Sequence, residues 1–230
     1  MEPRIGWRII MNYFIDALSW AFSADHWSGN GSITQRLVEH LWFTVMIVAI
    51  SSVLAIPTGI VIGHIRRGAG LIGALTGAAR AIPTLGLLTL FGLWLGIGLK
   101  APTLALIVLA IPSLLAGAYS GVESISPDIP SAAQAIGMTP WQVITSVELP
   151  LALPVIMGGI RAATLQVIAT ATLAAYTADI GLGRFLFAGL KSRDYSEMLG
   201  SSLIVIALAV VIDAALGRAQ RWAGNRFGDH

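Results

Sequence analysis

The sequence contains no cysteine and few charged residues. Without cysteine, the chain cannot form disulfides, thiol nucleophiles or thiolate metal sites. Charged residues make up 11% of its 230 residues, whereas a soluble domain of this length carries about 25%. So few charges cannot cover a surface that faces water. With 56% hydrophobic residues and a mean hydropathy of +0.79, most of the surface must face lipid.

The remaining charges do not point to nucleic acid or to a metal ion. The formal net charge is +2, lysine occurs only at Lys100 and Lys191, and no run of basic residues forms a stripe. Nucleic acid is therefore not an expected partner. The histidines are scattered without metal-ligand spacing, which favours solvated or interfacial side chains and no metal site. They are His26, His40, His64 and His230.

Five segments are long and apolar enough to cross a bilayer, which requires about 20 residues. They cover residues 41–63, 81–99, 101–122, 149–178 and 198–217. The exceptions to their lack of charge are Arg161 in the fourth segment and Asp213 in the fifth. We therefore predict an all-α, polytopic membrane protein with about five transmembrane helices.

Residues 1–35 differ from the rest, and we predict an N-terminal interfacial helix and a linker there. Apolar residues recur in pairs between Ile9 and Leu18, with polar residues between the pairs. This spacing of three to four residues indicates a one-sided helix that lies in the membrane interface. A sixth span is the competing interpretation. Residues 23–32, SADHWSGNGS, are predicted to be a flexible joint.

Charge does not decide the orientation in the membrane. With five spans, the lysine and arginine residues divide equally between the two sides, so the positive-inside rule gives no answer. The loop 123–148 shares its side with Arg66 and Arg67, and with five spans the tail 218–230 lies there too. The arginines on this side favour its assignment to the cytoplasm. Residues 36–217 are then the transmembrane domain.

The loop 123–148 carries two helix-start signals. The stretch SAAQ (131–134) has the spacing of a capping box, and Gly137 suits a left-handed helix stop. The stretch TPWQ (139–142) offers an N-cap threonine, a proline at the first helical position and a glutamine three residues after the cap. Pro150 is predicted to close that second helix and to begin the next span. We therefore predict two short helices with a hinge at residues 137–138.

This loop is more structured than a connector needs to be. Met138 and Trp141 form an apolar pair at i, i+3 on a loop that faces water. Apolar anchors exposed on a rigid element usually indicate a protein partner. The alternative is a solvated connector that only joins two spans.

The segment SAAQAIGMTPWQVITSVELPLALP (131–154) resembles the EAA loop of bacterial ABC importer permeases. That pattern has Glu-Ala-Ala, a glycine four residues after the second alanine, and then Ile-x-Leu-Pro. Ser131 stands in the place of the usual glutamate. The resemblance implies the type I ABC importer permease fold. The positions that match are Ala132, Ala133, Gly137, Val147, Leu149 and Pro150.

In that family the loop is a coupling helix that docks in a cleft of a cytoplasmic ATPase. The resemblance implies that residues 131–148 lie in the cytoplasm and pass ATP-driven motion to the spans of a multi-pass protein in the bacterial inner membrane. The implied partners are an ATPase dimer, a second permease chain that is identical or different, a separate extracytoplasmic solute-binding protein, and membrane lipid. The implied coupling residues are Ser131, Ala132, Ala133, Gly137, Met138, Thr139, Pro140, Trp141, Gln142, Leu149 and Pro150.

No catalysis and no cofactor are expected on this chain. It lacks the GxxxxGK[ST] phosphate loop, so ATP and Mg would be held by the partner ATPase. No cluster of His, Asp, Glu or Ser has the spacing of a membrane enzyme, which is the main rival outside transport. A passive channel, a further rival, would not require a capped loop.

Three other stretches narrow the resemblance to permeases for osmoprotectants. EHLWFTVMIVAISSVLAIPTGIVIG (39–63), RAIPTLGLLTL (80–90) and GIRAATLQVIATATLAAY (159–176) resemble their first, second and fourth spans. The resemblance implies transport of glycine betaine, choline, carnitine or proline, with methionine or another small solute as the alternative. One departure is visible after the fourth span, where Asp179 and Ile180 replace small residues.

Polar residues within the spans are candidates for lining the path of the solute. They are Thr84, Thr89, Thr164, Gln166, Thr170 and Thr172. The competing interpretation is that the threonines bond to their own helix backbone, whereas a buried Gln166 needs a partner. Arg161 is predicted to reach the cytoplasmic interface. Its alternative role is an ion pair with Glu148 that holds the loop.

Overall fold

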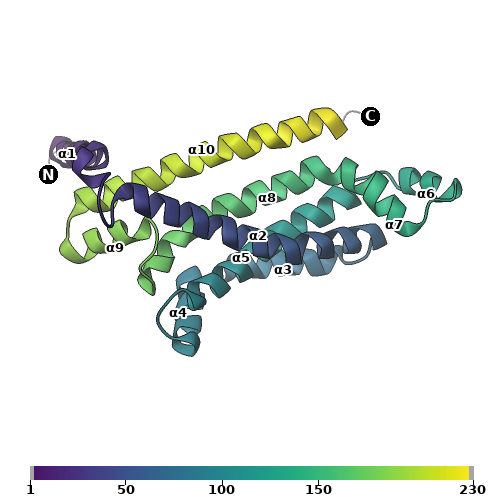
Figure 1. Cartoon of the computed structure of the whole chain (residues 1–230), viewed down its shortest axis with the longest axis horizontal. Coiled ribbons are helices and arrows are strands. Elements are labelled where there is room, and N and C mark those ends of the chain that lie inside the picture. Colours follow the sequence, from purple (N-terminus) through teal and green to yellow (C-terminus); the bar gives the residue numbers. More distant parts are fainter. Residues whose placement is uncertain (1–2, 228–230) are drawn as a thin grey trace.

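The computed structural model describes residues 3–227, and its long helices lie side by side (Figure 1). The helices α2 (Ile33–Ile65), α5 (Lys100–Glu123), α8 (Leu149–Ala171) and α10 (Tyr195–Phe227) run along the long axis. Each is long and apolar enough to cross a membrane. We call the end that carries α6 (Asp128–Ala135) and α7 (Pro140–Val143) the loop end, and the opposite end the far end. The all-α fold that the sequence predicts is confirmed.

The predicted second span, residues 81–99, is not one straight helix. The chain forms α3 (Ala69–Ala81) and α4 (Thr84–Leu95), which meet at an angle of 83°. Pro83 explains the break, because it disfavours helical geometry at the residue before it, and Ile82 is extended (φ −72°, ψ 120°). The described residues therefore hold four helices that are long and apolar enough to span, or five spans if the bent pair crosses the membrane as one.

The segment between α1 (Pro3–Phe22) and α2 is held by local hydrogen bonds. A 3-10 turn at Ala24–His26 follows α1. The indole N–H of Trp27 donates to Ala21 O at 2.8 Å. Ser32 caps α2, which thus begins eight residues before the predicted span at 41–63. The predicted joint at residues 23–32 thus contains local bonds that the sequence analysis did not single out.

The helix α1 lies across the far end of the bundle, against the start of α10 (Figure 1). Ala17 and Ala21 are buried there, whereas Ile10, Phe14 and other apolar side chains on the rest of α1 are exposed. One buried stripe beside an exposed apolar surface agrees with the predicted one-sided helix. Among the described helices, α1 is not one of those apolar enough to span.

Glycine lets the central helices touch backbone to backbone. A Cβ placed on Gly59 or Gly63 of α2 would lie 2.7 or 3.0 Å from a carbonyl oxygen of α5. A Cβ placed on Gly117 of α5 would lie 2.6 Å from the Cα of Gly159 in α8. Small residues allow helices in a membrane to approach this closely, and van der Waals packing then holds them. The helices α2, α5 and α8 are thereby packed into one unit.

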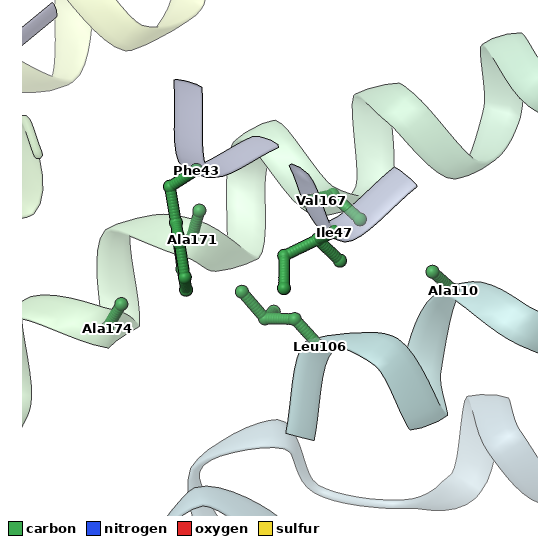
Figure 2. Packing of buried hydrophobic residues seen from close by; sticks show 7 residues of the cluster. All are labelled: Phe43, Ile47, Leu106, Ala110, Val167, Ala171 and Ala174. Carbon is green, nitrogen blue, oxygen red and sulfur yellow. The ribbon is translucent and has the colours of Figure 1, made fainter. Parts of the chain in front are cut away.

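The same three helices enclose an apolar cluster toward the far end. Figure 2 shows Phe43 and Ile47 of α2, Leu106 of α5, and Val167 of α8 converging on one point. All four are nearly inaccessible to solvent. The cluster and the glycine contacts together fix α2 against both α5 and α8.

Candidate functional site

The loop between α5 and α8 projects from the loop end of the bundle, beside the turn that joins α2 to α3 (Figure 1). It contains α6, α7 and a π turn at Ile144–Glu148. The loop therefore lies on the same side as Arg66, as the sequence predicts. The C-terminal end of α10 lies at this end too.

The first short helix begins earlier than the sequence predicts. The helix α6 starts at Asp128, and Ser131 lies inside it, where its hydroxyl donates to Pro127 O at 2.7 Å. The capping box predicted for residues 131–134 is therefore wrong. Pro130 explains the earlier start, because a first helical turn needs no N–H groups for internal bonds and tolerates proline there.

The hinge after α6 forms as predicted. Gly137 has a left-handed φ of +93°. Its N–H donates to Gln134 O at 2.9 Å, and the N–H of Met138 donates to Ala133 O at 3.1 Å. These two bonds are the Schellman pattern that ends helices at a left-handed residue. Most residues with a Cβ would be strained at this φ, whereas glycine adopts it without strain.

The second start signal is confirmed, but the predicted stop is wrong. Thr139 and Gln142 form a reciprocal capping box, with the N–H of Thr139 donating to Gln142 Oε1 at 2.8 Å. Pro150 lies in the first turn of α8, as predicted, but it does not end the preceding helix, because the helical run continues from Pro140 to Tyr176. A wider π turn lies before it, and Leu149 N–H donates to Ile144 O. Because the ring of Pro150 would clash with a carbonyl one turn earlier, the wider turn makes room for it.

Apolar side chains are exposed along the loop. Trp141 is 70% exposed and Ile136 is 83% exposed, whereas Met138 is half-buried. Ala133 and Val143 are buried and anchor the two short helices against the rest of the loop end. The expected apolar anchor at Trp141 is thus present at the surface, and Ile136 adds a second that the sequence analysis did not single out.

Both ends of this loop are bonded to the last turn of α2. The guanidinium of Arg66 donates to Ile125 O at 2.6 Å and to Glu123 O at 3.3 Å, near the end of α5. At the other end, Glu148 Oε2 lies 2.7 Å from Nδ1 of His64. The Glu148 side chain is 1% exposed. The alternative in which Glu148 pairs with Arg161 is therefore wrong, and His64 is a partner in the site rather than a solvated side chain.

The actual partner of Arg161 is Asp213. The guanidinium of Arg161 in α8 donates from Nε to Oδ1 at 2.5 Å and from Nη2 to Oδ2 at 2.7 Å. Both side chains are half-buried between α8 and α10. The two charges satisfy each other within spanning helices, where water is scarce. The sequence analysis predicted that Arg161 reaches the interface and did not identify Asp213 as its partner.

Removing one member of this pair is expected to destabilise the protein more than removing both. Arg161→Leu leaves the carboxylate of Asp213 without its partner, whereas the double change to leucine at both positions removes the whole charge pair. We expect Arg161→Leu to lower the midpoint of thermal unfolding and the double variant to recover most of the loss. Tryptophan fluorescence during heating in detergent measures this. A double variant that unfolds as early as the single one would contradict the prediction.

The predicted path residues divide into two kinds. The amide of Gln166 bonds across to α5, where Ser113 Oγ donates to its Oε1 at 3.0 Å and its Nε2 donates to Leu109 O at 3.3 Å. Four threonines donate to a carbonyl of their own helix, as the competing interpretation expects. They are Thr89, Thr164, Thr170 and Thr172. Thr84 lines a cavity of about 10 Å³ together with Thr170. Their role in a path stays a prediction.

A mainly apolar groove with a few polar side chains, which the sequence analysis missed, lies nearer the loop end. It has a volume of about 480 Å³ and is lined by α5, α8 and α10. Ser113 and Ser120 contribute hydroxyls, and Gln220 contributes an amide that donates to Pro154 O at 3.1 Å. Polar groups inside spanning segments usually face a partner or water rather than lipid. The period of α5 places Ser113 and Ser120 on one face, which is the signal that could have found them.

Comparison with known proteins identifies the fold and the family. The family described as "Binding-protein-dependent transport system inner membrane component" matches residues 55–229. The chain belongs to this family. It is therefore a transport subunit of the inner membrane, as the sequence predicts.

Two curated relatives of this permease come from Bacillus subtilis (strain 168). The choline transport system permease protein OpuBB is 33% identical over 84% of this chain and 89% of its own length. The glycine betaine/carnitine/choline transport system permease protein OpuCB is 31% identical over the same shares. Among solved structures, an inward-facing MetNI methionine ABC transporter matches with a TM-score of 0.67 and 23% identity, covering 82% of this chain and 96% of that one. That similarity confirms the predicted type I permease fold.

The departure that the sequence shows after the fourth span has a structural explanation at the far end of the permease. Asp179 Oδ1 lies 2.9 Å from Nη2 of Arg36 and 2.8 Å from Nε of Arg184. The N–H of Gly181 donates to Glu39 Oε2 at 3.0 Å. These contacts join the start of α2 to the loop before α9 (Gly183–Ser192). Asp179 therefore bridges two elements where a small residue would leave the arginines without this partner.

Proposed function

We propose that this permease forms the membrane path of an ABC importer for a small compatible solute of the glycine betaine, choline, carnitine or proline type. The relatives named for choline, glycine betaine and carnitine transport cover most of the chain and support this substrate class over methionine. The similarity to the methionine transporter supports the fold alone. The observation that carries the proposal is the rigid, exposed loop between α5 and α8.

The loop has the properties of a docking element for a motor protein. Its two short helices are fixed by the Schellman turn at Gly137 and by the capping box at Thr139. Trp141 and Ile136 project from it into solvent. Large apolar side chains on a rigid element are typical anchors of a protein interface. In this proposal the ATPase dimer binds the loop on the cytoplasmic side and holds ATP and Mg itself, while residues 131–133, 137–142 and 149–150 supply the coupling surface.

The remaining partners follow from the same proposal. Four or five spans are few to enclose a path, so a second permease chain, identical or different, completes it. A separate extracytoplasmic solute-binding protein delivers the solute to the far end. Gln166, whose amide bridges α8 and α5, is the strongest candidate to line the path, followed by the threonines predicted from the sequence.

Co-purification and transport test this function together. The permease is extracted in mild detergent to determine whether an ATP-hydrolysing chain remains bound, and the complex is then placed in liposomes with its solute-binding protein. We expect ATP-dependent uptake of a labelled compatible solute such as glycine betaine and little uptake of methionine. Uptake of methionine alone would overturn the substrate class. A permease that purifies without any ATPase and transports without ATP would overturn the importer itself.

A further inference from the structure

The last turn of α2 contacts the loop between α5 and α8, residues 123–148, at both of its ends. We call this segment the coupling loop. Arg66 adopts a left-handed conformation with φ 53°, and its guanidinium bonds two carbonyls where α5 gives way to the loop. His64, two residues earlier, meets the carboxylate of Glu148 where the loop gives way to α8. Residues 84 positions apart in the chain are thus joined at one turn. A connector that served only α5 and α8 would not need this third attachment.

The contact with Glu148 is specific because its carboxylate is buried. The side chain is 1% exposed, and His64 Nδ1 is the partner at 2.7 Å. A carboxylate buried without a hydrogen-bonding partner is strongly disfavoured, so Glu148 and His64 hold each other in place. Because Glu148 is the last residue of the π turn, any movement of α7 along its axis reaches this pair directly.

The helix α2 is also in a position to carry such a movement through the membrane. Gly63 and Gly59, about one and two turns before Arg66, lie against the backbone of α5, and the apolar cluster fixes the far half of α2 against α5 and α8 (Figure 2). Close packing of this kind transmits displacement instead of absorbing it. A motion delivered to residues 63–66 therefore reaches the far end, where Asp179 bridges α2 and α9.

We propose that the coupling loop moves α2 directly, through residues 63–66, in addition to α5 and α8. His64 and Arg66 are positioning residues that make α2 move with α5 and α8 when the ATPase closes. The inference rests on the proposed function. It adds that the first span is driven by the loop directly, and that the loop is clamped at both ends. We call the contacts of His64 with Glu148 and of Arg66 with the end of α5 the clamp. Without the clamp, the loop would rotate relative to α8, and part of the movement produced by each ATP would not reach the spans.

The test measures solute uptake and ATP hydrolysis on the same liposomes. The double variant His64→Leu with Glu148→Leu removes both polar groups at once, which avoids leaving a buried charge without a partner. Glu148→Gln is the conservative variant, because its amide still bonds His64. Thr145→Val is the matched control, since Thr145 lies in the same π turn and its hydroxyl donates to Trp141 O, one turn earlier. Co-purified ATPase and the thermal midpoint verify that each complex is assembled and folded.

We expect the double variant to hydrolyse ATP in response to the solute-binding protein while uptake per ATP falls about tenfold, the factor that one lost hydrogen bond to a charged group gives. Glu148→Gln and Thr145→Val should keep the wild-type ratio. An unchanged ratio in the double variant would overturn the clamp while leaving the importer function intact. An assembled double variant that loses hydrolysis and uptake in proportion would also overturn it, because each ATP hydrolysed would then still move as much solute as in the wild type. A wild-type complex without ATP-dependent uptake would overturn both proposals.

Discussion

Gly117→Val is expected to leave little folded protein, and Gly117→Ala to destabilise it by about 1–3 kcal/mol, the usual cost of overpacking. A Cβ at residue 117 would lie 2.6 Å from the Cα of Gly159, and neither side of this contact is a flexible side chain that can move aside. The helices α5 and α8 must therefore separate along their whole interface. Fluorescence-detected size exclusion and thermal unfolding in detergent measure the loss.

Gly224→Ala is the matched control for this prediction. Gly224 also lies within a long helix, α10, but a Cβ there would meet nothing within 4 Å. Alanine is favoured over glycine in a helix, so we expect no loss and a gain of about 0.4–1 kcal/mol at most. Equal stability of Gly117→Ala and Gly224→Ala would show that α5 and α8 do not touch at these glycines.

Gly137→Pro and Trp141→Asp are expected to uncouple ATP hydrolysis from transport while the chain stays inserted in the membrane. Proline fixes φ near −65°, so it cannot adopt the +93° of Gly137, and it lacks the N–H that bonds Gln134 O. Trp141→Asp removes the 70% exposed indole. If this indole is an interface hot spot of about 2 kcal/mol or more, the ATPase should bind at least about 30-fold more weakly.

Conservative changes at the same positions separate docking from general damage. Gly137→Asn keeps a residue that tolerates the left-handed region, and Trp141→Phe keeps an aromatic anchor. Both should retain most of the coupled uptake, measured as solute transported per ATP hydrolysed. If Gly137→Pro and Trp141→Asp transport as efficiently as the wild type, the loop does not couple the motor to the spans.

The features that the sequence predicts well are those set by neighbouring residues. The capping box of Thr139 and Gln142 and the left-handed stop at Gly137 depend on a few consecutive positions. The box at Ser131 failed although its spacing is the same. There Asp128 and Pro130 allow an earlier start, and the choice between two starts depends on how α6 packs against Val143 and its surroundings. Spacing alone does not contain that information.

The contacts that the sequence analysis missed join residues far apart in the chain. His64 and Glu148, and Arg161 and Asp213, are each brought together by helix packing. The sequence indicates that a buried carboxylate needs a partner, but several cations on the same side of the membrane qualify. The glycine contacts that set the distances between α2, α5 and α8 decide among them. The break at Pro83 is different, because a proline within an apolar run predicts a kink or a break of the span from the sequence alone.

The π turn at Ile144–Glu148 holds one residue more than an α-helix would use over the same rise. Because each residue of an α-helix turns the chain by about 100°, this extra residue sets the direction in which Trp141 points relative to α8. A relative of this protein that has lost one residue between positions 144 and 148 would keep a continuous helix here, but its tryptophan would project from a different side of that helix. In the proposed importer, the fit between the permease and its ATPase can therefore change through the deletion of a single codon, without any change to the membrane-embedded helices.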